Sequence, residues 1–252
     1  YKRKKGDQRP EAELRQEAAA ALKKFQARGL DLGYGHDGKF GMPPAIKDTL
    51  YKVYADAKRS LYLDLDAEWL AAHADALVLE TTATDRKDYV LHPPKGEVLS
   101  EKSLVALREH RKALEATQDL PDVQVVISDG LNAESITAKG QVDPFLTELR
   151  SGLKAKGLKQ GRDILVKNGR VRAGYQVGQE LFGEDSTARN ATVHVIGERP
   201  GNGQNTYSVY IGGVPRLRWK SGINHDVVRV VSGVSVTSTP PAKAAQQVIE
   251  IL

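Results

Sequence analysis

Short apolar segments alternate with longer amphipathic segments over most of the chain. The apolar segments predict strands at residues 76–80, 123–127, 163–166, 191–196, 207–211 and 227–231. Helical periodicity predicts helices at residues 100–115, 143–156, 174–182 and 240–252. Strands that alternate with helices are typical of parallel sheets, so the pattern predicts an α/β fold with a largely parallel sheet flanked by helices.

The N-terminal part of the chain has a different pattern. Residues 10–28 are rich in Ala, Glu, Lys and Leu and predict a helix, with Pro10 in its first turn and Gly29 ending it. Its apolar residues recur on one face: Leu14, Ala18, Leu22 and Phe25.

Glycine and proline are dense between residues 29 and 44, which indicates an irregular linker. A second helix is predicted at residues 46–62. We therefore predict that residues 1–45 form an N-terminal helix and a glycine-rich linker, appended to a domain at residues 46–252.

The last predicted helix has a clear start signal. Thr239 precedes two prolines, which predicts that Thr239 caps the helix and that proline occupies its first turn.

Composition excludes several kinds of site. The chain has no cysteine, which rules out disulfides, thiolate nucleophiles and cysteine metal ligands. Its six histidines lack metal-binding spacing, so we predict no metal site. There is no GxSxG elbow, and neither glycine-rich phosphate-binding pattern occurs. We therefore predict no catalytic residue, and a nucleotide is not the first choice of ligand.

The charge pattern bears on partners and location. The formal net charge is +5, and much of the excess lies between Lys2 and Arg9. This run predicts a solvated tail, with an arm that meets nucleic acid or an acidic partner as the alternative. No apolar run approaches the ~20 residues of a membrane span, and no signal-peptide pattern occurs. We expect a cytoplasmic protein without a membrane partner.

A glycine-rich loop, GERPGNGQN at residues 197–205, follows the fourth predicted strand. Open α/β sheets bind ligands at such strand ends. Glu198 and Arg199 in this loop could form an internal ion pair or cap a turn. Alternatively, the Glu198 carboxylate could accept hydrogen bonds from the amide groups of a ligand.

A second loop follows the strand at residues 123–127. Asp129 and Gly130 are typical of a tight turn. The alternative is that this segment contacts a ligand at the same edge of the sheet.

Several sequence blocks occur in an order that resembles one enzyme family. They are DRKDYVLHPPKG at 85–96, VVISDGLNAESI at 125–136, VKNGRV at 166–171, VIGERPGNGQNTYSVYI at 195–211 and VVSGVSVTSTPPAKAA at 230–245. Over roughly residues 70–252, the chain resembles the small subunit of ethanolamine ammonia-lyase.

The resemblance implies a Rossmann-like domain that packs against a large barrel subunit, with adenosylcobalamin held between the two chains. The large subunit would carry substrate and radical chemistry, and the small subunit would be inactive alone. Val171, Glu198 and Val231 match the positions that line the cofactor. We expect backbone or packing contacts from the valines, and hydrogen bonds from corrin amides to Glu198. A higher hetero-oligomer is expected, and the N-terminal segment could direct it into a bacterial microcompartment.

The chain also departs from the family pattern. The block that the family usually has after its first helix is not recognisable in residues 29–66. Gly233 stands where the family commonly has Asn, and Ser235 stands where it has His. A lyase subunit that acts on another amino alcohol is therefore one alternative. The other is a stand-alone Rossmann-type module that binds a nucleotide or RNA. Against RNA, aromatic residues make up only 6% of the chain.

Overall fold

The computed structural model describes residues 8–27, 44–183, 189–200, 205–215 and 228–252. It divides into two units, Tyr1–Lys52 and Val53–Leu252, which are described separately. The basic N-terminal run and Gly29, with the linker that follows it, lie outside the described residues.

The first unit contains the N-terminal helix α1 (Glu11–Gln26) and the first half of α2 (Pro44–Ser60). Helix α1 carries acidic residues in its first turn and basic residues in its last turn, which complements the helix dipole. Both helices were predicted, but Pro10 is the N-cap of α1 and does not lie within its first turn.

All six predicted strands are present and form one sheet in the order β1-β3-β2-β4-β5-β6. They are β1 (Leu77–Glu80), β2 (Val123–Ser128), β3 (Ile164–Lys167), β4 (Arg189–Gly197), β5 (Tyr207–Pro215) and β6 (Arg229–Val234). Strands β1 to β4 pair in parallel, as predicted, whereas β5 and β6 are antiparallel to their neighbours. Only residues 198–206 link β4 to β5, whereas parallel pairing needs a crossover of a dozen or more residues. The predicted α/β class is confirmed, with a mixed sheet.

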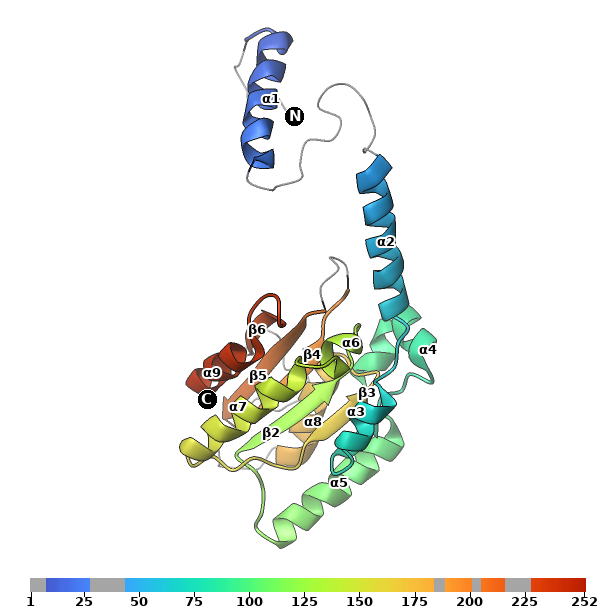
Figure 1. Cartoon of the computed structure of the whole chain (residues 1–252). Helices are drawn as coiled ribbons and strands as arrows, with labels where there is room; N and C mark the ends of the chain where they lie inside the picture. The colour runs from blue at the N-terminus through green and yellow to red at the C-terminus, as the bar shows by residue number, and fades with distance from the viewer. Residues whose placement is uncertain (1–7, 28–43, 184–188, 201–204, 216–227) are drawn as a thin grey trace. The chain divides into compact units, whose positions relative to one another are not determined.

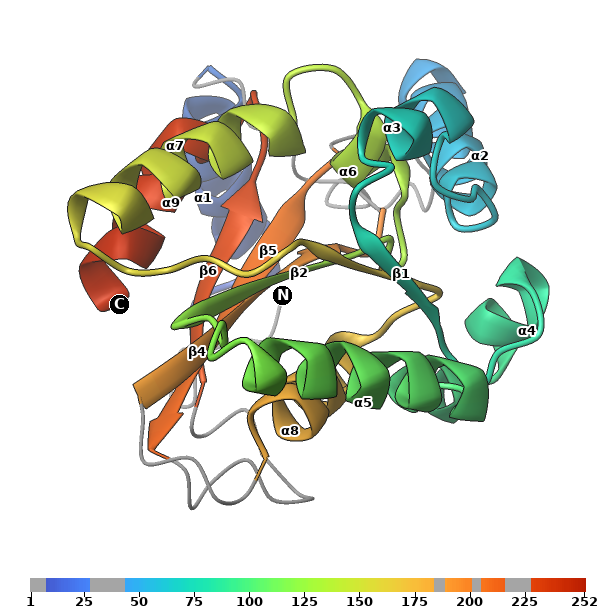
Figure 2. The same ribbon diagram turned by 90° about the horizontal axis from the view of Figure 1, so that it is seen from below.

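Two layers of helices flank the sheet (Figures 1 and 2). The long helices of the second unit are α5 (Glu101–Ala116), α7 (Val142–Ala155), α8 (Val171–Phe182) and α9 (Pro241–Ile251). Helices α5 and α8 lie on one face of the sheet, and α7 and α9 lie on the other. The hydrophobic core is accordingly divided into two clusters, one on each face.

Short helices that the sequence pattern did not predict lie before and between the strands. They are α3 (Ala67–Ala72), α4 (Arg86–Leu91), the 3-10 helix η1 (Pro93–Glu97) and α6 (Glu134–Thr137). Asp66 and Asp85 cap α3 and α4 by accepting hydrogen bonds from backbone N–H groups. Such short helices have too few turns to show a periodic pattern.

Two predicted helix starts need correction. Helix α8 begins at Val171 and not at residue 174, so Val171 is its first residue. The N-cap of α9 is Pro240 and not Thr239. The Thr239 backbone is instead bonded to the end of β6, because its N–H donates to the Gly233 carbonyl.

Gly233 adopts a left-handed backbone conformation, with φ of +67°. Glycine reaches this region without strain, and asparagine reaches it more readily than most residues. Glycine in place of the family's usual Asn is therefore compatible with this backbone conformation.

Candidate functional site

The chain leaves the carboxyl ends of β2 and β3 in opposite directions. The segment after β2 leads to α6 and α7 on one face of the sheet, whereas the segment after β3 leads to α8 on the other. Since β2 and β3 are neighbours, their ends form a topological switch point. Ligands of open α/β sheets bind at such crevices.

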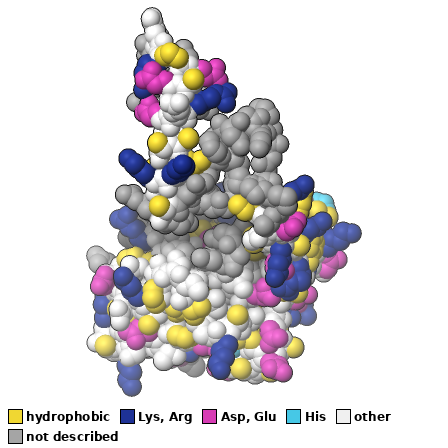
Figure 3. Space-filling model, turned by 45° about the horizontal axis from the view of Figure 1, so that its top comes forward, with side chains coloured by type: hydrophobic (Ala, Val, Ile, Leu, Met, Phe, Trp, Pro, Cys, Tyr) yellow, Lys and Arg dark blue, Asp and Glu magenta, His cyan; other side chains and the backbone are white. Residues whose placement is uncertain are grey.

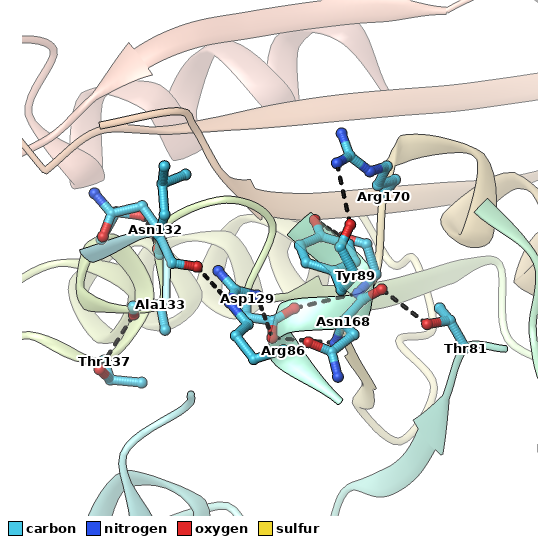
Figure 4. Close-up of polar contacts among 12 residues, drawn as sticks. Thr81, Arg86, Tyr89, Asp129, Asn132, Ala133, Thr137, Asn168 and Arg170 are labelled. Atoms are coloured by element: carbon cyan, nitrogen blue, oxygen red, sulfur yellow. Dashed lines mark hydrogen bonds and ion pairs between the residues drawn. The ribbon is translucent and has the colours of Figure 1, made fainter. Parts of the chain in front are cut away.

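A buried ion pair occupies this edge of the sheet. Arg86, from α4, donates from Nη1 to Oδ2 of Asp129 at 3.0 Å (Figure 4). The side chains are only 6% and 2% exposed. Arg86 also donates from Nε to the Leu61 carbonyl at 2.8 Å, which fixes the plane of the guanidinium group.

Asp129 also holds the loop after β3. Its carboxylate oxygens accept hydrogen bonds from the backbone N–H groups of Asn168 at 3.1 Å and Gly169 at 3.2 Å. Burial raises the pKa of Asp129 to about 6, and Arg86 and these two N–H groups oppose that rise. Asp129 therefore joins its own turn to helix α4 and to the loop after β3.

Two hydroxyl groups donate hydrogen bonds to the backbone carbonyls of the same loop. Thr81 Oγ1 donates to the Asn168 carbonyl at 2.9 Å, and the Tyr89 hydroxyl donates to the Gly169 carbonyl at 3.2 Å. Arg86 and Arg170 each place their guanidinium carbon within 5 Å of the Tyr89 ring centroid, at 4.8 and 4.9 Å. The loop that leads into Val171 is thus closely positioned.

The turn after β2 approaches the end of β4 closely. Gly130 has φ of +53°, and a Cβ atom there would lie 2.1 Å from the Gly197 carbonyl oxygen. The Leu131 N–H donates to the same carbonyl at 2.9 Å. The predicted tight turn is confirmed, and only glycine suits this position.

Buried polar atoms without a partner gather at this edge. Of the eight such side-chain atoms among the described residues, five belong to carboxyl-edge residues. They are Arg86 Nη2, Asn132 Oδ1, Gln141 Oε1, Asn168 Oδ1 and Arg170 Nε. Buried polar groups normally have partners, so this concentration of unpartnered atoms marks the carboxyl edge as a candidate functional site.

The structure brings two of the three predicted cofactor residues to this edge. Val171 follows β3 at the start of α8, and Glu198 directly follows β4. Glu198 is half-buried, its N–H donates to the Thr206 carbonyl at 3.0 Å, and its charge helps to raise the pKa of Tyr210 on β5. No ion pair is found for Glu198 or Arg199 among the described residues. Part of their loop, residues 201–204, lies outside those residues.

The third predicted residue, Val231, is placed differently. Residues that pair across β4, β5 and β6 share a face of the sheet, and Val231 pairs with Val209, which pairs with Val195. All three belong to the core cluster under α7 and α9, and Val231 is 8% exposed. Its side chain therefore packs in the core. That the main chain of Val231 contacts the cofactor stays a prediction.

The neighbours of Val231 lie on the face that α8 flanks. Val230 pairs with Tyr210, which pairs with His194, and His194 pairs with Val126 of the cluster under α5 and α8. Yet Val230 is 45% exposed, and the next surface residue, Ser232, is also exposed. Tyr175 of α8 lies beside Tyr210, as its effect on the Tyr175 pKa shows. On β5 this face is buried at Ser208 and Gly212, whereas Val230 and Ser232 of β6 are exposed; we call this exposed strip of β6 the open face.

A serine–histidine contact nearby is poorly suited to catalysis. Ser128 Oγ lies 2.8 Å from His194 Nε2, but the two residues are 0% and 1% exposed. Burial lowers the pKa of His194 to about 3. A Cβ atom on Gly174 would lie 2.1 Å from His194 Nδ1, so helix α8 closes over the ring. This pair has no access to a substrate.

The described residues contain no cluster of three or more His, Asp or Glu side chains that could hold a metal ion. None of the helices in the described part of the chain is long and apolar enough to cross a membrane. The edge offers acceptors, guanidinium groups and a nearby apolar face, a combination suited to binding and not to covalent catalysis.

The fold defines an α/β domain of the doubly wound kind, with a candidate binding site at its carboxyl edge. The sequence model of one family, described as "Ethanolamine ammonia-lyase light chain (EutC)", matches residues 19–252. The match covers nearly the whole chain, and the chain belongs to this family. It is therefore a small subunit of ethanolamine ammonia-lyase, and a light chain implies a heavy-chain partner.

The family match extends further than the blocks quoted from the sequence. The resemblance covered roughly residues 70–252, whereas the match begins at residue 19 and so includes the divergent residues 29–66. The sequence also gave no signal for Arg86 as the partner of Asp129, since 43 positions separate them.

Proposed function

We propose that this subunit forms one wall of an adenosylcobalamin site, against the large subunit, in an enzyme that converts ethanolamine to acetaldehyde and ammonia. The observation that carries the proposal is that Val171 and Glu198 both lie at the carboxyl edge of the sheet, after β3 and β4. Both residues stand in sequence blocks that resemble the family's cofactor-lining segments.

The residues at this edge fit the chemistry of such a cofactor. A corrin ring is a broad, largely apolar surface fringed with amide groups. Val230 on the open face and the half-buried Val171 at the start of α8 are apolar contacts for the ring. The half-buried Glu198 could accept hydrogen bonds from amide N–H groups.

When bound, the cofactor would supply a radical by homolysis of its cobalt–carbon bond. The residues of this chain would bind and orient it. Glu198 would accept amide hydrogen bonds, and its charge would complement the positive cobalt–corrin unit. Val171 would contact the ring from the first turn of α8. The main chain at Val231 would border the same surface through its exposed neighbours.

The assembly and its location are part of the same proposal. The open face, once joined to a large barrel subunit, would exclude water from the cofactor. We propose a higher hetero-oligomer in the cytoplasm, and the N-terminal segment is a candidate for directing it into a bacterial microcompartment.

The stand-alone nucleotide- or RNA-binding alternative has less support. On the face of the domain that Figure 3 shows, acidic and basic side chains of the described residues are interspersed, without a single basic patch. Electrostatic binding of nucleic acid relies on clustered Lys and Arg side chains. A lyase subunit acting on another amino alcohol differs only in the large subunit's substrate pocket, and it is an outcome of the test below.

The test is co-expression with a candidate large subunit, followed by adenosylcobalamin-dependent ammonia release from ethanolamine. We expect release that is lost when this chain is omitted. A complex that retains cobalamin but turns over only a different amino alcohol would change the substrate. If this chain binds cobalamin equally well without the large subunit, the shared-wall proposal is wrong.

A further inference from the structure

One short segment contacts both of the loops that carry Val171 and Glu198. Asp129 accepts hydrogen bonds from the N–H groups of Asn168 and Gly169, three and two positions before Val171. Two residues after Asp129, the Leu131 N–H donates to the carbonyl of Gly197, which directly precedes Glu198. The segment 129–131 therefore lies between the two loops and is bonded to each.

We propose that Asp129, with Gly130 and Leu131, acts as a brace that positions Val171 and Glu198 for the cofactor. Asp129 is a positioning residue in this account, because its carboxylate is 2% exposed and acts through the two loops. The inference rests on the proposed cobalamin site.

The brace is anchored outside the loops that it holds. Arg86 neutralises Asp129 and is itself fixed by the Leu61 carbonyl and the Tyr89 ring. Each Asp129 oxygen faces backbone or guanidinium N–H groups, so it works only as an acceptor. An amide in its place would point a donor N–H₂ group at one of these donors.

Buried ion pairs are weak evidence for stability, because desolvation offsets much of the attraction. A role in stability alone would therefore not explain why the pair stands between the two cofactor loops. The two explanations differ in a measurable way. A brace affects cofactor affinity more than an arginine-paired carboxylate elsewhere in the sheet does.

The chain offers such a pair as a control. Asp163 stands directly before β3, at the opposite edge of the sheet. Its carboxylate is 10% exposed, pairs with Arg150 at 2.5 Å and accepts a hydrogen bond from Gln160 at 2.9 Å. Asp129→Asn and Asp163→Asn thus make the same change in two arginine-paired carboxylates at opposite ends of the strands.

The experiment measures the dissociation constant of adenosylcobalamin by equilibrium dialysis, on each variant assembled with the large subunit. Thermal unfolding of each complex is recorded in parallel. We expect Asp129→Asn to weaken binding roughly tenfold, and Asp163→Asn to change it by less than about twofold, at similar unfolding midpoints. Amide hydrogen exchange at residues 168–171 and 197–199 should rise only in Asp129→Asn.

Equal cofactor affinity in the two variants, or equal exchange in these loops, would overturn the brace. If the wild-type complex binds no cobalamin at all, the proposed function fails first, and the exchange result still decides whether Asp129 holds the two loops.

If Asp129→Asn does not assemble, Gly130→Ala supplies the test. The added Cβ atom would meet the Gly197 carbonyl and displace the start of the Glu198 loop, while the ion pair stays intact. We expect weaker cofactor binding and faster exchange at residues 197–199. Wild-type values for both would contradict the inference.

Discussion

The two halves of the sheet differ in how far helices cover their faces. The parallel half, β1 to β4, has α5 and α8 on one face and α7 on the other, and its strand β2 is buried at all six positions. The antiparallel half, β5 and β6, is covered by α9 on one face, while Val230 on the other face is 45% exposed. The parallel half is therefore covered on both faces, whereas the antiparallel half leaves β6 exposed on one face, which we propose binds a ligand or a partner.

The largest effect is expected in the covered core. Phe145 on α7 is fully buried and meets Tyr207 edge to face, with ring centroids 6.1 Å apart. Phe145→Ala should lower the free energy of unfolding by about 3–5 kcal/mol, measured by chemical denaturation of the subunit. A loss below about 1 kcal/mol would show that this layer is not closely packed.

A charge change at the carboxyl edge should affect binding instead. Glu198→Gln keeps the size of the side chain but loses the anionic acceptor, so cobalamin retention in the complex should fall roughly tenfold, or about 1.4 kcal/mol. The unfolding midpoint should stay unchanged because Glu198 is half-buried and has no ion pair among the described residues. Unchanged retention would remove Glu198 from the site.

A smaller change compares two exposed valines on edge strands. Val230 on β6 and Val78 on β1 are 45% and 46% exposed, at opposite ends of the sheet order. Val230→Ser should weaken cofactor retention or subunit association about threefold, whereas Val78→Ser should leave both unchanged. Each should alter stability by about 0.5 kcal/mol or less. Equal effects of the two changes on binding would show that the open face has no special role.

The smallest expected effect concerns pH. Asp129 has a pKa of about 6, and Arg86, Asp64 and Tyr89 are the charged or titratable groups that act on it. Acidification through pH 6 would protonate Asp129 and weaken its hold on the loop after β3. Cofactor retention should fall a few-fold between about pH 7 and about pH 5.

The effect of Asp129 on stability has the opposite sign. Its pKa in the folded state lies above the ordinary value of 3.8, so its contribution to folding stability rises as the pH falls from about 6 towards 4. Retention that falls while stability holds would separate the two roles. The Asp129→Asn variant should lack this pH dependence, and a variant that keeps it would assign the titration to another group.

The sequence predicted elements better than contacts. The strands were found because runs such as residues 123–127 are apolar except for Gln124, and long helices such as α5 have several turns of periodic pattern. The antiparallel end of the sheet follows from the short link between β4 and β5, a signal that the alternation pattern alone does not contain.

The site was predictable only in part. Glu198 directly follows β4 and Val171 lies four positions after the end of β3, so the shared position of both at the carboxyl edge follows from the pattern. Asp129 reads as a turn residue because its partner Arg86 lies on a six-residue helix that has no periodic signal. The burial of Val231 depends on its register against Val209, which no local pattern specifies.

The most direct test of the central claim is amide hydrogen exchange of the assembled complex, with and without adenosylcobalamin. The account predicts protection of residues 168–175, 197–200 and 230–233 on cofactor binding, with residues 157–163 at the opposite edge unchanged. Protection confined to other parts of this subunit, or no change in it at all, would contradict the claim that its carboxyl edge and open face form a wall of the cofactor site.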